Sequence, residues 1–202
     1  MLRLLLVRHG ETTWNAGRRL QGDTDVPLSE TGRRQASALA ATVAAHRPGM
    51  LVCSPLSRAR ETAARLGHPP APADLDPRWA EAHLGDWSGR LAADLRAEGP
   101  DYDRWRAGRH RPPSGESLDD LAARVLPALA DLRTRTGDRG TALVVTHGGP
   151  IRAVLRALLS LEPARIVPAA PASLTVLELA DTPRLSAYNV VPLAVDAAET
   201  TD

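Results

Sequence analysis

This 202-residue sequence is poor in several features, and each scarcity excludes a class of protein. A single cysteine excludes an internal disulfide framework and suits a reducing cytoplasm. No apolar run approaches the roughly 20 residues of a membrane helix, and the start of the chain shows no signal-peptide pattern. The net charge of +1 gives no general attraction to a membrane surface or to nucleic acid, and no basic–aromatic interleaving is visible. We therefore expect a cytoplasmic protein that binds neither membrane nor nucleic acid.

Lysine and phenylalanine are absent as well, and all 25 basic residues are arginine. A GC-rich coding sequence accounts for most of this bias. Its structural consequence is that any anion site in this protein is built from arginine, whose planar guanidinium group matches the oxygens of a phosphate.

Short apolar runs alternate with helical patterns along the chain. The apolar runs predict buried strands at 2–7, 50–53, 141–146, 174–179 and 185–190. The helical patterns extend from Ser29 to Pro48, over 56–66 and 118–135, and from Pro150 onward. This alternation predicts an α/β fold, a three-layer α/β/α sandwich with a mostly parallel central sheet and helices on both faces. We expect one domain over residues 1–192 and a flexible tail over 193–202.

Residues 84–115 interrupt this rhythm with glycines, two tryptophans and a cluster of arginines. We interpret the segment as an inserted cap over a binding site. The cluster comprises Arg104, Arg106, Arg109 and Arg111. Either these arginines form a solvated face, or one or two of them reach over the site and bind a carboxylate or a second phosphate of a substrate.

Ligands in open α/β sheets gather beyond the carboxyl ends of the strands. Three predicted strands end in the segments Arg8-His9-Gly10, Ser54–Arg58 and Thr146-His147-Gly148. A phosphate monoester fits all three segments. Arg8 and Arg58 would grip its oxygens bidentately, and a protonated His147 would add a third contact. Glycines at 10, 148 and 149 permit close backbone approach.

His9 and Glu81 are the candidates for the chemistry at such a site. The neighbouring arginines lower the pKa of His9 and keep its imidazole neutral, which makes it a nucleophile toward phosphorus. The leaving alkoxide needs a proton, and Glu81, which directly precedes the cap, is placed to give it. The same carboxylate would then activate the water that hydrolyses the phosphohistidine. Because arginines neutralise the phosphate, we expect no metal and no other cofactor.

Six blocks of this sequence, in this order, resemble the histidine phosphatase superfamily. They are VRHGETTWN, GRRLQGDTDVPLSETGRRQA, CSPLSRARETA, EAHLGDWSG, SGES and VTHGGPIR. The ordering is far more specific than any one block. The resemblance implies the phosphoglycerate mutase-like fold, a mostly parallel sheet between helices with an inserted cap over the site.

The resemblance also implies roles for individual residues. His9 would be the phosphate acceptor and Glu81 the proton donor. The phosphate pocket would be completed by Arg8, Arg58 and His147. The substrate-binding positions would be Asn15, Gln21, Gly22 and Gly148.

The HLGDWSG stretch and the modest length resemble the small phosphatase branch, which includes phosphatases of sugar phosphates and of phosphoglycerate esters, those of glucosyl-phosphoglycerate among them. The implied activity is that of a metal-independent phosphomonoesterase acting on small phosphorylated metabolites. Two alternatives stay open, a cofactor-dependent phosphoglycerate mutase and a non-catalytic module that binds phosphorylated ligands. The oligomeric state also stays open, a homodimer through an exposed strand or helix included.

Three rival sites are disfavoured by their sequence context. Cys53 and Arg58 are separated by four residues, whereas the cysteine-phosphatase loop has five, and Cys53 ends an apolar strand where a thiol is commonly inert. Asp23-Thr24-Asp25 follows a polar loop and is typical of a turn rather than of an aspartyl nucleophile. Glu81 and His83 lack a third partner for a metal.

Overall fold

A computed structural model describes residues 1–137 and 139–192; the predicted tail, 193–202, lies outside the described residues. Its centre is a five-stranded sheet of order β2-β3-β1-β4-β5. The strands are β1 (Leu2–Arg8), β2 (Met50–Cys53), β3 (Gly140–Thr146), β4 (Leu174–Leu179) and β5 (Arg184–Val190). The β2–β3 and β3–β1 pairs are parallel, whereas β4 runs antiparallel to both of its neighbours. The mostly parallel sheet is therefore confirmed, with β4 as the reversed strand.

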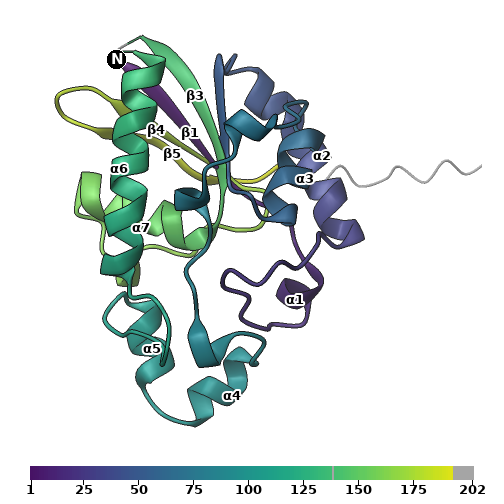
Figure 1. Ribbon diagram of the computed structural model, residues 1–202, viewed down its shortest axis with the longest axis vertical. Coiled ribbons are helices and arrows are strands. Elements are labelled where there is room, and N and C mark those ends of the chain that lie inside the picture. Colours follow the sequence, from purple (N-terminus) through teal and green to yellow (C-terminus); the bar gives the residue numbers. More distant parts are fainter. Residues whose placement is uncertain (138, 193–202) are drawn as a thin grey trace, which may run out of the picture.

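Helices cover both faces of the sheet (Figure 1). One face carries α2 (Glu30–Ala44) and α3 (Ser57–Arg65), and the other carries α6 (Leu118–Thr136) and α7 (Gly148–Leu159). Alternate side chains of β1 pack against the two helix layers, because successive residues of a strand point to opposite faces of the sheet. Leu5 and Val7 pack with the α2–α3 layer, and Leu4 and Leu6 pack with the α6–α7 layer. The predicted three-layer α/β/α sandwich is confirmed.

The helices begin and end at residues that the sequence marks. Ser29 caps α2 by accepting a hydrogen bond from the Gly32 N–H at 3.0 Å. Ser117 and Asp120 form a reciprocal capping box at the start of α6. Gly67 follows α3 with a φ of +85°, the left-handed conformation that ends helices and favours glycine.

The segment between α3 and α6 contains only short elements. They are the 3₁₀ turns at Pro72–Asp74, Pro77–Trp79 and Gly85–Trp87 and the helices α4 (Ala92–Ala97) and α5 (Asp101–Arg106). In Figure 1, α4 and α5 lie below the sheet, at the same end of the molecule as α1 (Thr13–Ala16). Rings from Trp87, Tyr102, Trp105 and His110 contact one another and hold this segment together.

One further 3₁₀ turn, Pro163–Arg165, follows α7. Among the described residues, no helix combines the length and the apolar character that crossing a membrane requires.

Candidate active site

The carboxyl ends of β1 and β3 lie side by side and bring two histidines together. The His9 N–H donates to the carbonyl of Thr146 at 3.0 Å, which continues the pairing one residue beyond β1. The rings of His9 and His147 are 5.0 Å apart. The Gly10 N–H donates to Oγ1 of Thr62 on α3 at 3.0 Å, so the loop after β1 is also fixed to a helix. The three predicted strand-end segments therefore meet at one edge of the sheet.

A cavity of approximately 350 Å³ opens at this edge. Eight of the residues that the sequence singles out line it, namely Arg8, His9, Asn15, Gln21, Gly22, Arg58, Glu81 and Gly148. His147 lies behind this lining and is fully buried. Arg8 and His147 are 139 positions apart in the sequence (147 − 8), and the parallel pairing of β1 with β3 brings them together.

His9 presents one free ring nitrogen. Its Nδ1 lies 2.7 Å from the Gly10 carbonyl oxygen, which can only accept, so Nδ1 carries the hydrogen and Nε2 carries the lone pair. Burial, with the charges of Arg8 and Arg58, holds the pKa of His9 well below its ordinary value. A neutral imidazole with a bare Nε2 is the form that attacks phosphorus.

His147 is neutral for similar reasons. Arg58 Nε donates to its Nδ1 at 3.3 Å, and its Nε2 lies 2.7 Å from Oγ of Ser54. Burial and the charge of Arg58 hold the pKa of His147 well below its ordinary value. The sequence predicts a protonated His147 in contact with bound phosphate. In the structure, burial and the adjacent Arg58 cation favour the neutral form.

Arg58 lies in the first turn of α3 and has no exposed surface. Its guanidinium group is held in place by hydrogen bonds. Its two terminal nitrogens donate to the carbonyls of Gly22 and Thr24, each at 2.7 Å. Burial lowers the pKa of Arg58 to about 10, so the side chain stays charged at neutral pH. Arg8 Nε is buried without a partner among the described residues, and such an unsatisfied donor beside a cavity is typical of a ligand site.

Glu81 faces the cavity from the loop before the cap segment. The Gly149 N–H, at the start of α7, donates to both of its carboxylate oxygens at 3.1 and 3.2 Å. A Cβ atom on Gly149 would overlap Oε1 of Glu81, so any larger residue here would displace this carboxylate. A half-buried carboxyl group beside a phosphate pocket is placed to exchange a proton with the ester oxygen.

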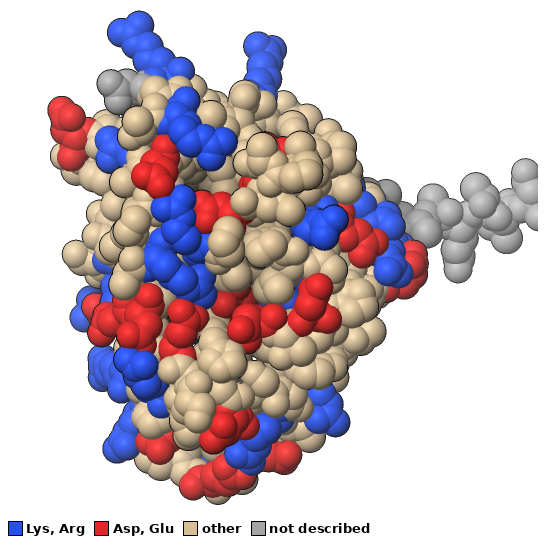
Figure 2. All heavy atoms as spheres, in the orientation of Figure 1, with Lys and Arg blue, Asp and Glu red and all other residues tan. Residues whose placement is uncertain are grey.

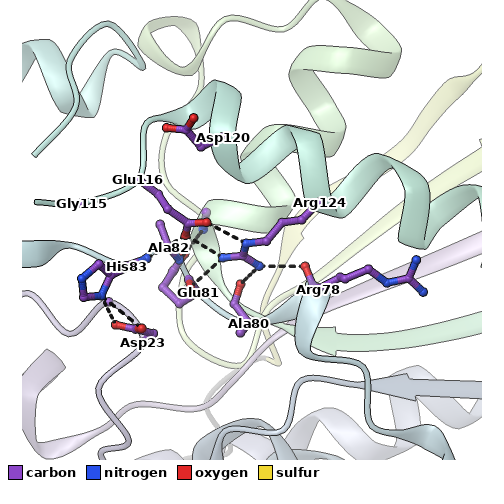
Figure 3. A network of polar contacts seen from close by, with 12 residues as sticks. Asp23, Arg78, Ala80, Glu81, Ala82, His83, Gly115, Glu116, Asp120 and Arg124 are labelled. Carbon is purple, nitrogen blue, oxygen red and sulfur yellow. Dashed lines mark hydrogen bonds and ion pairs between the residues drawn. The ribbon is translucent and has the colours of Figure 1, made fainter.

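A second layer fixes the backbone that carries Glu81 (Figure 3). Arg124, on α6, donates through Nε and Nη2 to the carboxylate of Glu116 at 3.0 and 2.9 Å. Its remaining donors bind the carbonyls of Arg78, Ala80 and Glu81 at 2.8, 2.9 and 2.9 Å. Glu116 in turn accepts the N–H of His83 at 2.8 Å. Arg124 and Glu116 thus hold both sides of the segment around Glu81, and we call this pair the Arg124 clamp.

Asn15 and Gln21 offer their amide nitrogens to the cavity. Thr12 Oγ1 donates to Oε1 of Gln21 at 2.8 Å, and the Thr12 N–H donates to Oδ1 of Asn15 at 3.1 Å. Because both amide oxygens are engaged, both amide NH₂ groups remain for a ligand; the part of the chain that the structure describes gives them no partner. Gly22 has a φ of +56°, which favours glycine, and its carbonyl is one of those that hold Arg58.

Residues 84–115 also contribute to the lining of the cavity. Of the four clustered arginines, Arg106 lines the cavity, whereas Arg104 pairs with Asp101 and is exposed. Tyr102 and Trp105 line it too. Of the two alternatives for the cluster, Arg104 fits the solvated face, whereas the position of Arg106 fits an arginine that reaches the site.

Arg152 is a further cavity residue without an assigned role in the sequence analysis. It lies in the VTHGGPIR block, three and four positions after Gly149 and Gly148 on α7. Residues with this spacing share one helix face. Helical periodicity could therefore have found it, once the strand-end glycines were assigned to the site.

The rival sites do not assemble. Burial raises the pKa of the Cys53 thiol to about 12, which makes it a poor nucleophile. Asp25 accepts hydrogen bonds from the N–H and Oγ of Ser57, and Asp23 pairs with His83 at 3.0 Å on the surface. Within residues 1–137 and 139–192, no three His, Cys, Asp or Glu side chains are grouped so that they could hold a metal.

Comparison with known proteins gives consistent results. The family model of the histidine phosphatase superfamily, branch 1, matches residues 4–190. The chain is 42% identical over 168 residues to a glucosyl-3-phosphoglycerate phosphatase of Mycolicibacterium vanbaalenii, covering 79% of this chain and 75% of the relative. It is 37% identical over 169 residues to a probable phosphoglycerate mutase of Photorhabdus laumondii, covering 80% and 76%. A solved mycobacterial glucosyl-3-phosphoglycerate phosphatase in complex with VO₃ superposes with a TM-score of 0.85 and 38% identity, over 93% of this chain and 98% of that one.

The α/β sheet, with His9, Arg8 and Arg58 around one cavity at its edge, is the arrangement of an enzyme that acts on phosphate esters. The chain belongs to the histidine phosphatase superfamily, branch 1. It is a phosphatase, and its substrates are small phosphate esters.

Proposed function

We propose that the phosphatase is a metal-independent phosphomonoesterase that works through phosphorylated His9. The observation that carries this proposal is the bare Nε2 of His9 in a cavity lined by Arg8, Arg58 and Glu81. A binding module needs neither a nucleophile nor an acid at its phosphate site. The arginines supply the positive charge that a metal supplies in other phosphatases.

In the first step, Nε2 of His9 attacks phosphorus and the P–O bond to the leaving group breaks. Arg8 and Arg58 bind the phosphoryl oxygens while charge spreads over them. The amide groups of Asn15 and Gln21 donate to the same oxygens. Glu81, protonated, gives its proton to the leaving alkoxide, and the product alcohol departs.

In the second step, Glu81 takes a proton from water, and the water oxygen attacks phosphorus. The P–N bond breaks, so that inorganic phosphate leaves and His9 regains its lone pair. The ring of His147, whose Nε2 lies 2.7 Å from Oγ of Ser54, is the neighbour of the His9 ring at the phosphate site. We propose that it takes up a proton when the phosphate dianion enters, because an anion beside the ring raises the pKa of an imidazole.

The substrates that we propose are sugar phosphates or phosphoglycerate-type esters. This proposal is supported by the small size of the cavity and by the similarity to the Mycolicibacterium relative, which is named a glucosyl-3-phosphoglycerate phosphatase. A mutase is the second candidate, favoured by the name of the Photorhabdus relative. We further propose that residues 84–115 act as a cap that excludes water, since Tyr102, Trp105 and Arg106 from this segment line the cavity.

We propose a cytoplasmic location, supported by the single cysteine, which is free and buried. We also propose that nucleic acid is not a partner. On the face drawn in Figure 2, basic and acidic side chains are interspersed and form no basic stripe. The sedimentation coefficient of the purified chain measures its oligomeric state and shows whether it forms a homodimer.

Initial rates over a panel of phosphorylated sugars, glycerates, nucleotides and peptides, measured with EDTA present, test the function. We expect release of inorganic phosphate, the highest kcat/KM on the small sugar or glycerate esters, and no loss with EDTA. Loss of activity with EDTA would contradict metal independence. Transfer of phosphate between positions of glycerate in place of its release would favour the mutase, and tight binding without turnover would favour the binding module.

A further inference from the structure

The cavity holds more positive charge than one phosphate requires. Six arginines line it, namely Arg8, Arg18, Arg19, Arg58, Arg106 and Arg152, against a single carboxylate, Glu81. A phosphate dianion is matched by Arg8 and Arg58. Arg18 and Arg19 are exposed at the rim, where water solvates them. Arg106 and Arg152 are only partly exposed, and neither forms an ion pair with a described residue.

Arg152 has no ion-pair partner among the described residues. One nitrogen donates to the Arg106 carbonyl at 3.4 Å, a long hydrogen bond, and its guanidinium lies 5.5 Å from the ring centroid of Trp105. Burial, opposed by the charge of Glu81, lowers the pKa of Arg152. A guanidinium in this position is costly to desolvate unless an anion reaches it.

Arg106 completes the pair. It ends α5 in the cap segment, and the structure gives its side chain no hydrogen bond or ion pair to any described residue. Its charge acts on both Arg152 and Arg8, and it lowers the pKa of each. Arg106 and Arg152 line the same 350 Å³ cavity as Arg8 and Arg58, so one small molecule in this cavity can contact both pairs of arginines.

We propose that Arg152 and Arg106 form a second anion subsite, which binds a carboxylate on the same substrate whose phosphate is held by Arg8 and Arg58. This inference rests on the proposed function and narrows its substrates to phosphorylated acids. A carboxylate accepts parallel hydrogen bonds from a guanidinium in one plane. Trp105 supports the Arg152 guanidinium from one face and limits its rotation. A neutral sugar phosphate would leave both guanidinium groups unpaired.

A matched pair of substrates tests the subsite. 3-Phosphoglycerate and glycerol 3-phosphate differ only in a carboxylate that replaces a hydroxymethyl group. We expect the wild-type enzyme to favour the acid in kcat/KM. In Arg152→Gln and in Arg106→Gln, the ratio of the two kcat/KM values should fall by about 10- to 100-fold, as expected for a lost charge-assisted hydrogen bond. Arg152→Lys, which keeps the charge, should retain more of the ratio than Arg152→Gln does.

Arg109→Gln is the matched control, because Arg109 belongs to the same cluster but is exposed and does not line the cavity. Its ratio should equal that of the wild type. Equal hydrolysis of both substrates by the wild type, or a ratio unchanged in both Gln variants, would overturn the subsite and leave the phosphatase activity intact. If neither ester is hydrolysed and inorganic phosphate is not released from any phosphomonoester, the proposed function fails instead. Equilibrium binding of the same two esters to His9→Ala, with and without Arg152→Gln, then tests the subsite without turnover.

Discussion

His9 and His147 are buried beside two arginines, an arrangement that keeps both imidazoles uncharged. An unburied histidine has a pKa of about 6.5, and both residues titrate well below their ordinary value in the fold. The consequence for catalysis is a nucleophile that stays available in mildly acidic solution. The consequence for stability is a dependence on pH, since the unfolded chain binds protons that the folded chain does not.

The stability should therefore fall on acidification. Above pH ~6.5 both histidines are neutral in the folded and in the unfolded chain, so the protein has its full stability with respect to these two groups. As the pH falls below that value, the free energy of unfolding should decrease by up to about 1.4 kcal/mol per pH unit for each histidine. Urea unfolding from about pH 7.5 to 5 measures the slope, a range that lies above the titration of most carboxyl groups.

The His147→Gln variant shows how much of this slope comes from His147. Its free energy of unfolding should change with pH by about half as much as that of the wild type, because only His9 remains. A free energy of unfolding that is flat between these pH values in the wild type would contradict the neutral, buried state of both rings.

At the scale of elements, α6 contributes to the chemistry without touching the substrate. Arg124 lies on the side of this helix that faces the loop carrying Glu81, and it uses all five of its N–H donors there (Figure 3). The hydrogen bonds from Arg124 and His83 hold the pKa of Glu116 below its ordinary value, although burial acts in the opposite direction. The Arg124 clamp thus positions Glu81, the residue that we propose as the proton donor.

The Arg124→Gln variant should lose activity only where a proton is needed. For glycerol 3-phosphate, whose leaving group is an alkoxide, kcat/KM should fall by about 100-fold, the effect of a 1 Å misplacement. For 2,4-dinitrophenyl phosphate, whose leaving group departs unprotonated, kcat/KM should change by less than about threefold. Arg133→Gln, an exposed arginine on the same helix, is the control and should leave both values unchanged. Equal losses on both substrates would assign Arg124 a purely structural role.

Most elements of this fold follow from local pattern, and the exceptions follow from tertiary contacts. The apolar runs place the strands within a residue of their observed ends, and the caps at Ser29 and Ser117 mark where α2 and α6 begin, whereas α2 ends at Ala44, before the predicted stop at Pro48. Arg124 could not be assigned from its place in a helix, because no local pattern tells which loop crosses that helix. The same limit applies to the cap segment, where Arg106 rather than Arg104 or Arg109 faces the cavity.

At the scale of the whole molecule, the active site is a consequence of strand order. β1 and β3 are neighbours, and β2 lies beyond β3, so three chain segments end at one edge of the sheet. Sequence reasoning reaches this convergence because parallel α/β sheets share a general rule for ligand position. It does not reach the lowered pKa of His147, which follows first from the burial of the ring and then from the charge of Arg58 beside it.

Rapid-quench trapping of the phosphoenzyme tests most directly whether residues 8, 9, 58, 81 and 147 act on one phosphoryl group. A ³²P-labelled substrate should leave alkali-stable, acid-labile label on the protein, peptide mapping should place it on His9, and His9→Ala should carry none and lose turnover. Label on another residue, or a His9→Ala enzyme that hydrolyses the substrate at the wild-type rate, would contradict the mechanism.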